Sequence, residues 1–391
     1  MPEEIGKGIE INVDQELQEP ERVVLANILN AVSMKNQFSL IRKLLERARY
    51  DVNLRHTLNI FEVNNLNVEG LVVATLFDPT FLTPNAPALI QYKGNKLIYV
   101  TIEGVPKKSS VLYSPLPNLS YIAVSKFVGK MLTKAGVMVK AAFHHCIDVQ
   151  ETMAALKLRE QVRQRIETSF PGKVTFLFVG RNDPRKGIEK MIQANEILKS
   201  KGISNYVILV VSEPTLKDTL TDDRFVFVNP FGSLRHEQVL SMMSAVDFVV
   251  FPSKSEGFGL PVLESMSVGT PVVHTWMPPL TEFSSEEFNF VYDFDTVQAV
   301  DTKMSQFYVM HEYSAEYLAD SMEAAIDTIV NNRETYEEYR VKALKHSLDW
   351  EYRRIYTHML DFAGFEVDID AEKEGAKADI DKLNEMLGGV L

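Results

Sequence analysis

The sequence predicts an α/β protein built on parallel sheets that carry helices on both faces, and two observations support this. Between residues 174 and 273, short apolar runs alternate with segments of helical periodicity, a pattern typical of a doubly wound parallel sheet. The chain has 391 residues, which is long enough for two domains of ordinary size. We therefore expect two α/β domains.

The composition excludes several classes of protein. A hydrophobic content of 46% and a charged content of 24% are typical of a globular protein. The single cysteine, Cys146, cannot form an intramolecular disulfide, which fits a reducing cytoplasm. No apolar run reaches the ~18 residues of a spanning helix, and the acidic N-terminus is unlike a signal peptide. The net charge of −12 argues against nucleic-acid binding, so we expect a cytoplasmic protein without nucleic-acid partners.

The first half of the chain begins with an acidic arm at 1–21 and then alternates strands with helices. A helical period predicts a helix over 34–49, and Ser125 is a suitable N-cap for a second helix that Gly136 closes. The apolar runs predict strands at 22–29, 71–77, 96–102, 119–124 and 137–143.

A charged helix over 151–169 links the two halves, and Pro171-Gly172 marks the start of the second. The last segment, 366–391, is acidic and is expected to be a peripheral tail. Between them we expect strands at 174–179, 206–211, 225–228, 247–251 and 270–273, and helices at 188–199, 236–245, 313–330, 333–348 and 351–362.

The stretch from Ser255 to Gly269 is the most informative motif. Glu256-Gly257-Phe258-Gly259 is a glycine loop that opens onto a short helix, with Pro261 suited to its first helical position and Gly269 to its left-handed end. Free backbone N–H groups and the helix dipole favour an anion at such a terminus. Ligands bind at this edge of open α/β sheets, so we expect an anion pocket there.

Two carboxylates frame this pocket. Glu256 enters the loop and Glu264 lies one turn into the helix, so its side chain leans back toward the same mouth. Paired acceptors suit the vicinal hydroxyls of a ribose or hexose, and phosphate plus hydroxyls indicates a nucleotide sugar. The simpler interpretation is that Glu264 complements the helix dipole and that Glu256 is solvated. The loop, the proline and the eight-residue spacing together favour the interpretation that both carboxylates contact a ligand.

A second loop has the charge that such a ligand requires. Arg181 and Lys186 flank another predicted helix terminus, which Lys186-Gly187 opens. Two cations and helix dipoles can stabilise the charge that develops on a leaving diphosphate. Metal-dependent transferases instead hold a divalent ion with a D-x-D pair, and the two pairs here, at 293–295 and 368–370, do not follow a fitting strand and loop. We therefore expect transfer without a metal or another cofactor.

The run E-G-F-G-L-P-V-L-E resembles the E-x7-E signature of retaining GT-B glycosyltransferases, particularly glycosyltransferase family 4, and residues 178–187 resemble a second family motif. The resemblance implies two Rossmann-like domains around a cleft, at 1–149 and 150–350, with about 351–365 returning to complete the first and 366–391 as a tail. It implies a catalytic role for Glu256 and donor binding by Arg181, Lys186, Gly257, Phe258, Gly259, Leu260 and Glu264. It also places 231–233 near the base of the nucleotide.

The chain departs from this family at three places. Glu103 follows the strand at 96–102 where many relatives have a histidine, so it is a candidate catalytic residue or simply a solvated carboxylate. Residues 30–33 replace a glycine-rich turn. The run His144-His145-Cys146 has no second ligand cluster at a zinc spacing, so we expect a structural role, and only Asp148 matches the family turn that follows.

These features predict an enzyme that moves a sugar from a nucleotide-diphosphate sugar to an acceptor, a glycan or a lipid-linked sugar, with retention of configuration. Two alternatives are a non-catalytic sugar-nucleotide-binding partner subunit and an isomerase or phosphorylase on the same scaffold. Residues 22–147 carry 15 Lys+Arg against 6 Asp+Glu, a net of +9, while the remainder carries −21. This division favours an anionic acceptor or peripheral contact with the cytoplasmic leaflet.

Two predicted helices would present this positive charge beside apolar side chains. The first combines Arg42, Lys43, Arg47 and Arg49 with Phe38 and Leu45, and the second combines Lys126, Lys130 and Lys134 with Phe127 and Met131. The three lysines are spaced by four residues and therefore share one helix face. A solvated helix face is the alternative explanation for either helix.

Overall fold

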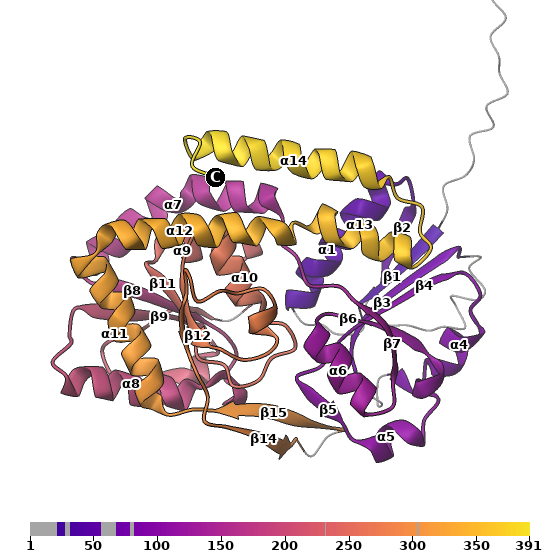
Figure 1. Ribbon diagram of the computed structural model, residues 1–391, viewed down its shortest axis with the longest axis horizontal. Coiled ribbons are helices and arrows are strands. Elements are labelled where there is room, and N and C mark those ends of the chain that lie inside the picture. The colour runs from indigo at the N-terminus through magenta and orange to yellow at the C-terminus, as the bar shows by residue number, and fades with distance from the viewer. Residues whose placement is uncertain (1–21, 28–31, 56–67, 79–81, 231, 303–304) are drawn as a thin grey trace, which may run out of the picture.

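The computed structural model describes residues 22–391 except 28–31, 56–67, 79–81, 231 and 303–304. Within these residues the chain forms two six-stranded sheets and one three-stranded sheet (Figure 1). Each large sheet has helices on both faces and forms its own half of the molecule. The predicted fold class, α/β with two Rossmann-like halves, is confirmed.

The N-terminal sheet has the strand order β2-β1-β3-β4-β6-β7, and all its pairs are parallel. Its strands are β1 (Arg22–Asn27), β2 (Asp51–Arg55), β3 (Gly70–Leu76), β4 (Asn95–Thr101), β6 (Ser120–Ala123) and β7 (Met138–Ala142). Its helices are α1 (Val32–Arg47), α4 (Ala86–Gln91), α5 (Lys108–Leu112) and α6 (Lys126–Lys134). Ser125 caps α6 as predicted, because its side chain accepts a hydrogen bond from the Val128 N–H.

The C-terminal sheet has the order β10-β9-β8-β11-β12-β13, again with parallel pairs only. Its strands are β8 (Val174–Val179), β9 (Tyr206–Ser212), β10 (Phe225–Pro230), β11 (Phe248–Phe251), β12 (Val272–Thr275) and β13 (Phe290–Tyr292). Its helices are α8 (Ile188–Ser200), α9 (His236–Ala245), α10 (Leu260–Ser267), α11 (Ala315–Asn331) and α12 (Arg333–Ser347). Short single turns, 184–186, 214–218, 280–282 and 348–350, connect some of these elements.

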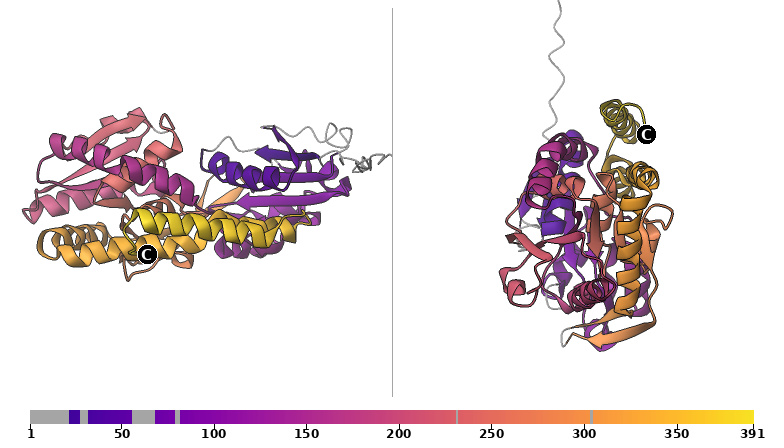
Figure 2. Two further views of the ribbon diagram at one scale, coloured as in Figure 1. Left: turned by 90° about the horizontal axis from the view of Figure 1, so that it is seen from above. Right: turned by 90° about the vertical axis from the view of Figure 1, so that its left-hand side faces the viewer.

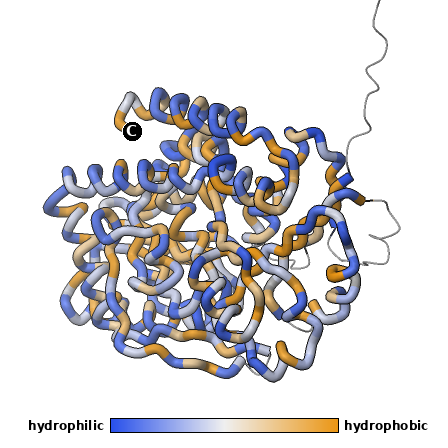
Figure 3. The backbone as a smooth tube through the Cα atoms, turned by 45° about the vertical axis from the view of Figure 1, so that its right-hand side comes forward, coloured by the Kyte–Doolittle hydropathy of each residue, from blue (hydrophilic) through white to orange (hydrophobic). Residues whose placement is uncertain are grey.

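Burial explains why these segments form central strands. Every residue of β9 and β11 is buried, as expected for strands covered by helices on both faces. Hydrophobic residues concentrate in the interior of each half, and the outward turns of the helices are hydrophilic (Figure 3). No helix in the described ranges is both long enough and apolar enough to cross a membrane.

Two helices connect the halves. Helix α7 (Val149–Ser169) begins at Asp148, whose side chain accepts a hydrogen bond from the Gln150 N–H, and leads into the second half. Helix α13 (Tyr352–Phe362) returns to the first half, where the Tyr356 hydroxyl donates to Gln37. This return agrees with the prediction for 351–365.

The C-terminal segment is more than the peripheral tail that we expected, because α14 (Ile369–Met386) extends along both halves (Figure 2). Glu372 pairs with Arg47 of α1 at 2.6 Å, and Asp379 pairs with Arg353 of α13 at 2.9 Å. Leu383 is fully buried. The acidic composition of this segment had suggested a solvated tail, but two of its acids, Glu372 and Asp379, bind arginines of other helices.

A small sheet that the sequence did not predict also joins the halves. The hairpin of β14 (Thr296–Asp301) and β15 (Gln306–Glu312) belongs to the second half, and β15 pairs antiparallel with β5 (Gly104–Pro106) of the first. The Val309 N–H donates to the Glu103 carbonyl at 3.3 Å, and the Lys107 N–H donates to the Ser305 carbonyl at 2.8 Å. The two halves therefore share a sheet beside Glu103.

The expectation that the basic helices also expose apolar side chains is wrong. The apolar residues in question are all buried: Phe38, Leu45, Phe127 and Met131. They point to the core because the helices α1 and α6 are amphipathic and turn their apolar sides toward the sheet. Only the basic side chains remain on the outside.

Candidate active site

The glycine loop connects β11 to α10 and is fitted closely between the two halves. Gly259 caps α10 with φ of 97°, a conformation that favours glycine, and Gly269 has φ of 71° after its end. The Gly257 carbonyl accepts a hydrogen bond of 2.8 Å from the Ser125 hydroxyl of the N-terminal half. A Cβ atom at Gly257 would lie 2.3 Å from the Thr101 hydroxyl, so only glycine fits this contact.

Phe258, predicted to bind the donor, turns its side chain away from the pocket. The ring is buried, stacks on Phe283 at 4.6 Å between centroids and meets His145 edge-on at 5.1 Å. Leu260 is buried at the start of α10. Both residues can therefore offer only backbone groups to a ligand, which is how helix N-termini bind anions.

Glu256 is at the centre of a compact charged cluster. Its Oε1 atom lies 2.5 Å from Lys186 Nζ and accepts a hydrogen bond from Ser253 Oγ at 2.5 Å, and its Oε2 lies 3.5 Å from Arg185 Nη1. Burial alone would raise the pKa of Glu256, but Lys186 and Arg185 outweigh it and lower the pKa. Burial also lowers the pKa of Lys186, against the opposing effect of Glu256. Glu256 is thus held as a carboxylate facing two cations.

Arg185 belongs to this cluster, although the sequence analysis did not select it. Its Nη1 donates to the Ser255 carbonyl at 3.1 Å, and its Nη2 lies 3.5 Å from Glu103 Oε1. Its Nε is buried and has no hydrogen-bond partner in the described part of the chain. In the sequence, only the pair of adjacent basic residues at 185–186 pointed to Arg185. Such a pair is weak support, because an arginine in a loop is more often solvated.

Glu103 belongs to the N-terminal half and lies between the end of β4 and the start of β5. Its carboxylate faces Arg185, and its carbonyl accepts a hydrogen bond of 2.6 Å from the Ser255 hydroxyl. The structure therefore brings together two of the predicted catalytic residues, Glu103 and Glu256, with the guanidinium of Arg185 between them. Glu103 is not the solvated carboxylate of the alternative interpretation.

Arg181 does not join the cluster in this structure. Its side chain is 72% exposed, and its Nε lies 3.1 Å from Oε1 of Glu213. Lys186, in contrast, has a side chain only 13% exposed. The two predicted phosphate ligands thus differ: the lysine is already in place, whereas the arginine lies at the surface.

Glu264 is buried at the second turn of α10, and its carboxylate is bound by a histidine. Oε1 of Glu264 lies 2.9 Å from Nε2 of His236, whose Nδ1 lies 2.7 Å from Oε2 of Glu151 in α7. Burial alone would lower the pKa of His236, but Glu264 and Glu151 raise it to about 10. The sequence analysis did not select His236, because a residue at the start of an ordinary helix shows no partner from elsewhere in the chain.

The His144-His145-Cys146 run has structural partners. His144 lies 2.8 Å from Glu282, whose carboxylate accepts hydrogen bonds from the first two N–H groups of α6. His145 lies 3.1 Å from the Tyr99 hydroxyl, and burial lowers its pKa to about 3. Among the residues that the structure describes, no group of three or more His, Cys, Asp or Glu side chains could hold a metal ion.

Comparison with known proteins gives a consistent result. The sequence model of the family "Glycosyl transferases group 1" matches residues 160–317. An uncharacterised glycosyltransferase of Sulfolobus islandicus rod-shaped virus 1 is 30% identical over 297 residues, which are 75% of this chain and 87% of the viral protein. The O-antigen chain mannosyltransferase B of Escherichia coli is 28% identical over 151 residues, 37% of this chain and 39% of that enzyme.

Solved structures share the fold. Anabaena HepE, solved in complex with UDP and glucose, aligns with a TM-score of 0.62 at 13% identity, covering 88% of this chain and 99% of that one. Sucrose-phosphate synthase from Thermosynechococcus elongatus aligns with a TM-score of 0.63 at 16% identity, covering 88% and 98%. The folds, the matched motifs and the long viral relative lead to one conclusion: this chain belongs to the group 1 family of glycosyl transferases and is a glycosyltransferase.

Proposed function

We propose that the enzyme transfers a sugar from a nucleotide-diphosphate sugar to an acceptor hydroxyl with retention of configuration and without a metal ion. The observation that carries the proposal is the charged cluster at the mouth of α10. Two cations, Lys186 and Arg185, face the glycine loop and the N-terminus of that helix. Cations and a helix terminus together can stabilise the charge of a departing diphosphate.

In the structure, the Glu256 carboxylate is paired with both of these cations. A bound diphosphate would share them, which shifts the Glu256 carboxylate toward the sugar that the phosphate carries. The bond between the anomeric carbon and the diphosphate oxygen breaks, the acceptor oxygen bonds to the same face of the sugar, and the acceptor proton passes to a phosphate oxygen. In this scheme Arg181, free to swing from Glu213, adds a further cation to the diphosphate, and Glu264 accepts hydrogen bonds from the hydroxyls of the nucleoside.

The donor class and the metal independence can be tested together. The pure protein is incubated with UDP-, GDP- and ADP-sugars, with and without EDTA, and donor hydrolysis and acceptor-dependent transfer are measured. We expect slow hydrolysis that an acceptor stimulates and that EDTA leaves intact, and proton NMR of the product should show the anomeric configuration of the donor. Activity that chelation abolishes and manganese restores would overturn the metal-free scheme. Binding without turnover would indicate a partner subunit instead.

We further propose that the acceptor side meets an anionic surface, such as a lipid-linked sugar at the cytoplasmic leaflet. Lys126, Lys130 and Lys134 of α6 are all exposed, and no salt bridge involves them among the described residues. In the same half of the molecule, α5 ends at Leu112, which is 62% exposed, and is followed by Tyr113, which is 93% exposed. Basic residues near an anionic bilayer contribute about 1 kcal/mol each. An exposed tyrosine beside lysines is also typical of membrane interfaces.

Helix α1 contributes less to this surface than the sequence suggested. Three of its basic residues already pair with acids: Arg42 with Glu46, Lys43 with Asp148, and Arg47 with Glu372. These pairs stabilise the fold and leave little free charge on that helix. Of these two helices, α6 is therefore the one whose basic side chains are not paired with acids in the described part of the chain.

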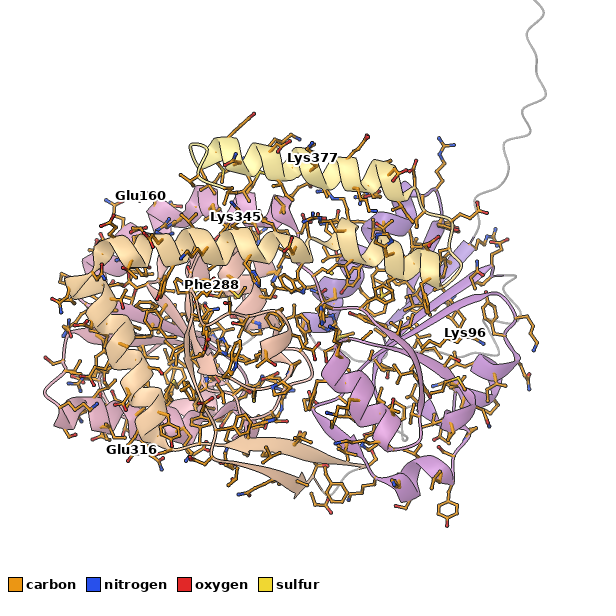
Figure 4. The ribbon with its side chains drawn as sticks, viewed as in Figure 1. Lys96, Glu160, Phe288, Glu316, Lys345 and Lys377 are labelled. Carbon is orange, nitrogen blue, oxygen red and sulfur yellow. The ribbon has the colours of Figure 1, made fainter. Side chains whose placement is uncertain are left out.

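Co-sedimentation with liposomes tests this contact. Binding is expected for anionic vesicles at low salt, absent for neutral ones, and lost in the triple variant Lys126→Glu, Lys130→Glu, Lys134→Glu. A matched control reverses three exposed lysines of α12 and α14 in the other half: Lys342, Lys345 and Lys377, two of which are labelled in Figure 4. Equal binding by both triple variants would show that net charge alone, and not α6, attracts the vesicles.

A further inference from the structure

His236 connects three helices around the predicted nucleoside contact. The residue begins α9, its Nε2 faces Glu264 of α10, and its Nδ1 faces Glu151 of α7. We infer that His236 is a positioning residue that holds the Glu264 carboxylate toward the ribose hydroxyls of the donor. The inference rests on the proposed role of Glu264. It adds to that role a second residue, His236, on which the preference for a ribose depends.

The geometry fixes which form of the imidazole is present. An ionised carboxylate can only accept hydrogen bonds, so two carboxylates at 2.7 and 2.9 Å require a proton on each ring nitrogen. The ring is therefore an imidazolium that shares its charge between Glu151 and Glu264. The raised pKa of His236 agrees with this assignment.

The ring is also fixed from its other side. Glu151 Oε1 lies 3.7 Å from Lys43 Nζ of α1, and the same ammonium lies 2.7 Å from Asp148. These contacts hold Glu151, Glu151 holds Nδ1, and the ring cannot turn away from α10. The series of charges runs from the acceptor-side helix α1 to the donor-side helix α10, and its signs alternate.

This arrangement leaves one oxygen of Glu264 available. Oε1 is bound by His236, and within the described residues Oε2 accepts no side-chain hydrogen bond. The carboxylate lines a small cavity between the halves together with Asn36, Gln37 and Ser267. Without a hydrogen-bond donor at this position, nothing would hold Glu264 in place, and repulsion from Glu151 would favour its turning away. His236 therefore both orients the carboxylate and offsets that repulsion.

Two substitutions separate the two contacts of the ring. In His236→Gln the side-chain amide nitrogen comes close to the position of Nε2, so the donation to Glu264 is retained. In His236→Asn the amide nitrogen comes close to the position of Nδ1, so only the donation to Glu151 is retained. The two variants are both neutral amides of similar size, and they differ in which carboxylate they reach.

Calorimetric titration with nucleotides provides a readout that a purely structural role would not change. The tightest binder among UDP, GDP and ADP is compared with its 2′,3′-dideoxy counterpart, and pyrophosphate serves as the control for the phosphate site. The wild type is expected to prefer the ribonucleotide by about ten- to a hundredfold, the range for hydrogen bonds to a charged group. His236→Gln should keep most of this preference, His236→Asn should lose it, and pyrophosphate should bind all three alike.

The outcomes distinguish this inference from the role of Glu264 itself. Glu264→Gln serves as the control and is expected to show no preference for the ribonucleotide. If the wild type also shows no preference, the ribose contact of the proposed function is refuted, and with it the basis of the inference. A preference that His236→Asn retains in full would overturn the inference and leave the ribose contact standing. If His236→Asn does not fold, Glu151→Ala replaces it, because it removes the acceptor that holds Nδ1 without touching Glu264. An unchanged preference in that variant would equally overturn the inference.

Discussion

Replacing Lys186 by methionine removes one charge from the centre of the site and keeps the length of the side chain. Glu256 would then remain buried beside Ser253 and Arg185 only, the latter at 3.5 Å. Breaking a buried ion pair costs about 3–5 kcal/mol, because the remaining charge is uncompensated. Since Arg185 still offers partial compensation, we expect the lower end, about 3 kcal/mol. For a domain of this size that loss corresponds to a fall in Tm of about 6–12 °C.

Thermal unfolding and titration with a nucleoside diphosphate test this reasoning. The double variant Lys186→Met, Glu256→Gln contains no uncompensated carboxylate, so it should recover most of the lost stability. It should not recover nucleotide binding, which we expect to fall by about tenfold or more in both variants because a cation for the phosphates is missing. A single variant as stable as the wild type, or a double variant less stable than the single one, would refute the assignment of a buried ion pair.

Three further predictions concern other parts of the site. Arg181→Ala should weaken nucleoside diphosphate binding by about tenfold in titrations. The same variant should change Tm by no more than about 2 °C, because only the exposed pair with Glu213 is lost. A large loss of stability would contradict the surface position of Arg181. Gly257→Ala should reduce turnover by about a hundredfold, because its Cβ would force the loop from Thr101, and unchanged kinetics would show that the halves are not in contact there. His236 has a folded pKa of about 10 against 6.5 unfolded, so its stabilisation is full below pH 6.5 and is lost toward pH 10. Denaturant unfolding of the wild type should therefore lose about 1.4 kcal/mol per pH unit more than His236→Gln in that window, and parallel profiles would disprove the ion pairs.

The fold and the loops of the site could be predicted because their signals are local. Alternating apolar runs identify β9 and β11, and Gly257, Gly259 and Pro261 identify the loop and helix start from a few adjacent residues. Each of these features depends on backbone conformation or burial at neighbouring positions. Sequence patterns contain that information directly.

The partners of the site could not be predicted, because they depend on the tertiary arrangement. Arg185 meets Glu103 across 82 positions of sequence, and His236 meets Glu151 across 85. The acids of α14 gave the composition of a solvated tail, since nothing in that segment shows the arginines that they bind. The burial of Phe127 and Met131 is different, because their spacing by four residues puts them on the apolar side of an amphipathic helix, and that pattern already indicated that they face the sheet.

The shared sheet beside Glu103 restrains how far the two halves can separate. Any motion that separates β5 from β15 breaks the pairing of residues 306–308 with 104–106 and two flanking backbone hydrogen bonds, Val309 to Glu103 and Lys107 to Ser305. Each contributes about 1 kcal/mol, so widely opened molecules would be outnumbered about thirtyfold from these bonds alone. This strand pair therefore favours the arrangement in which Glu103 stays beside Arg185.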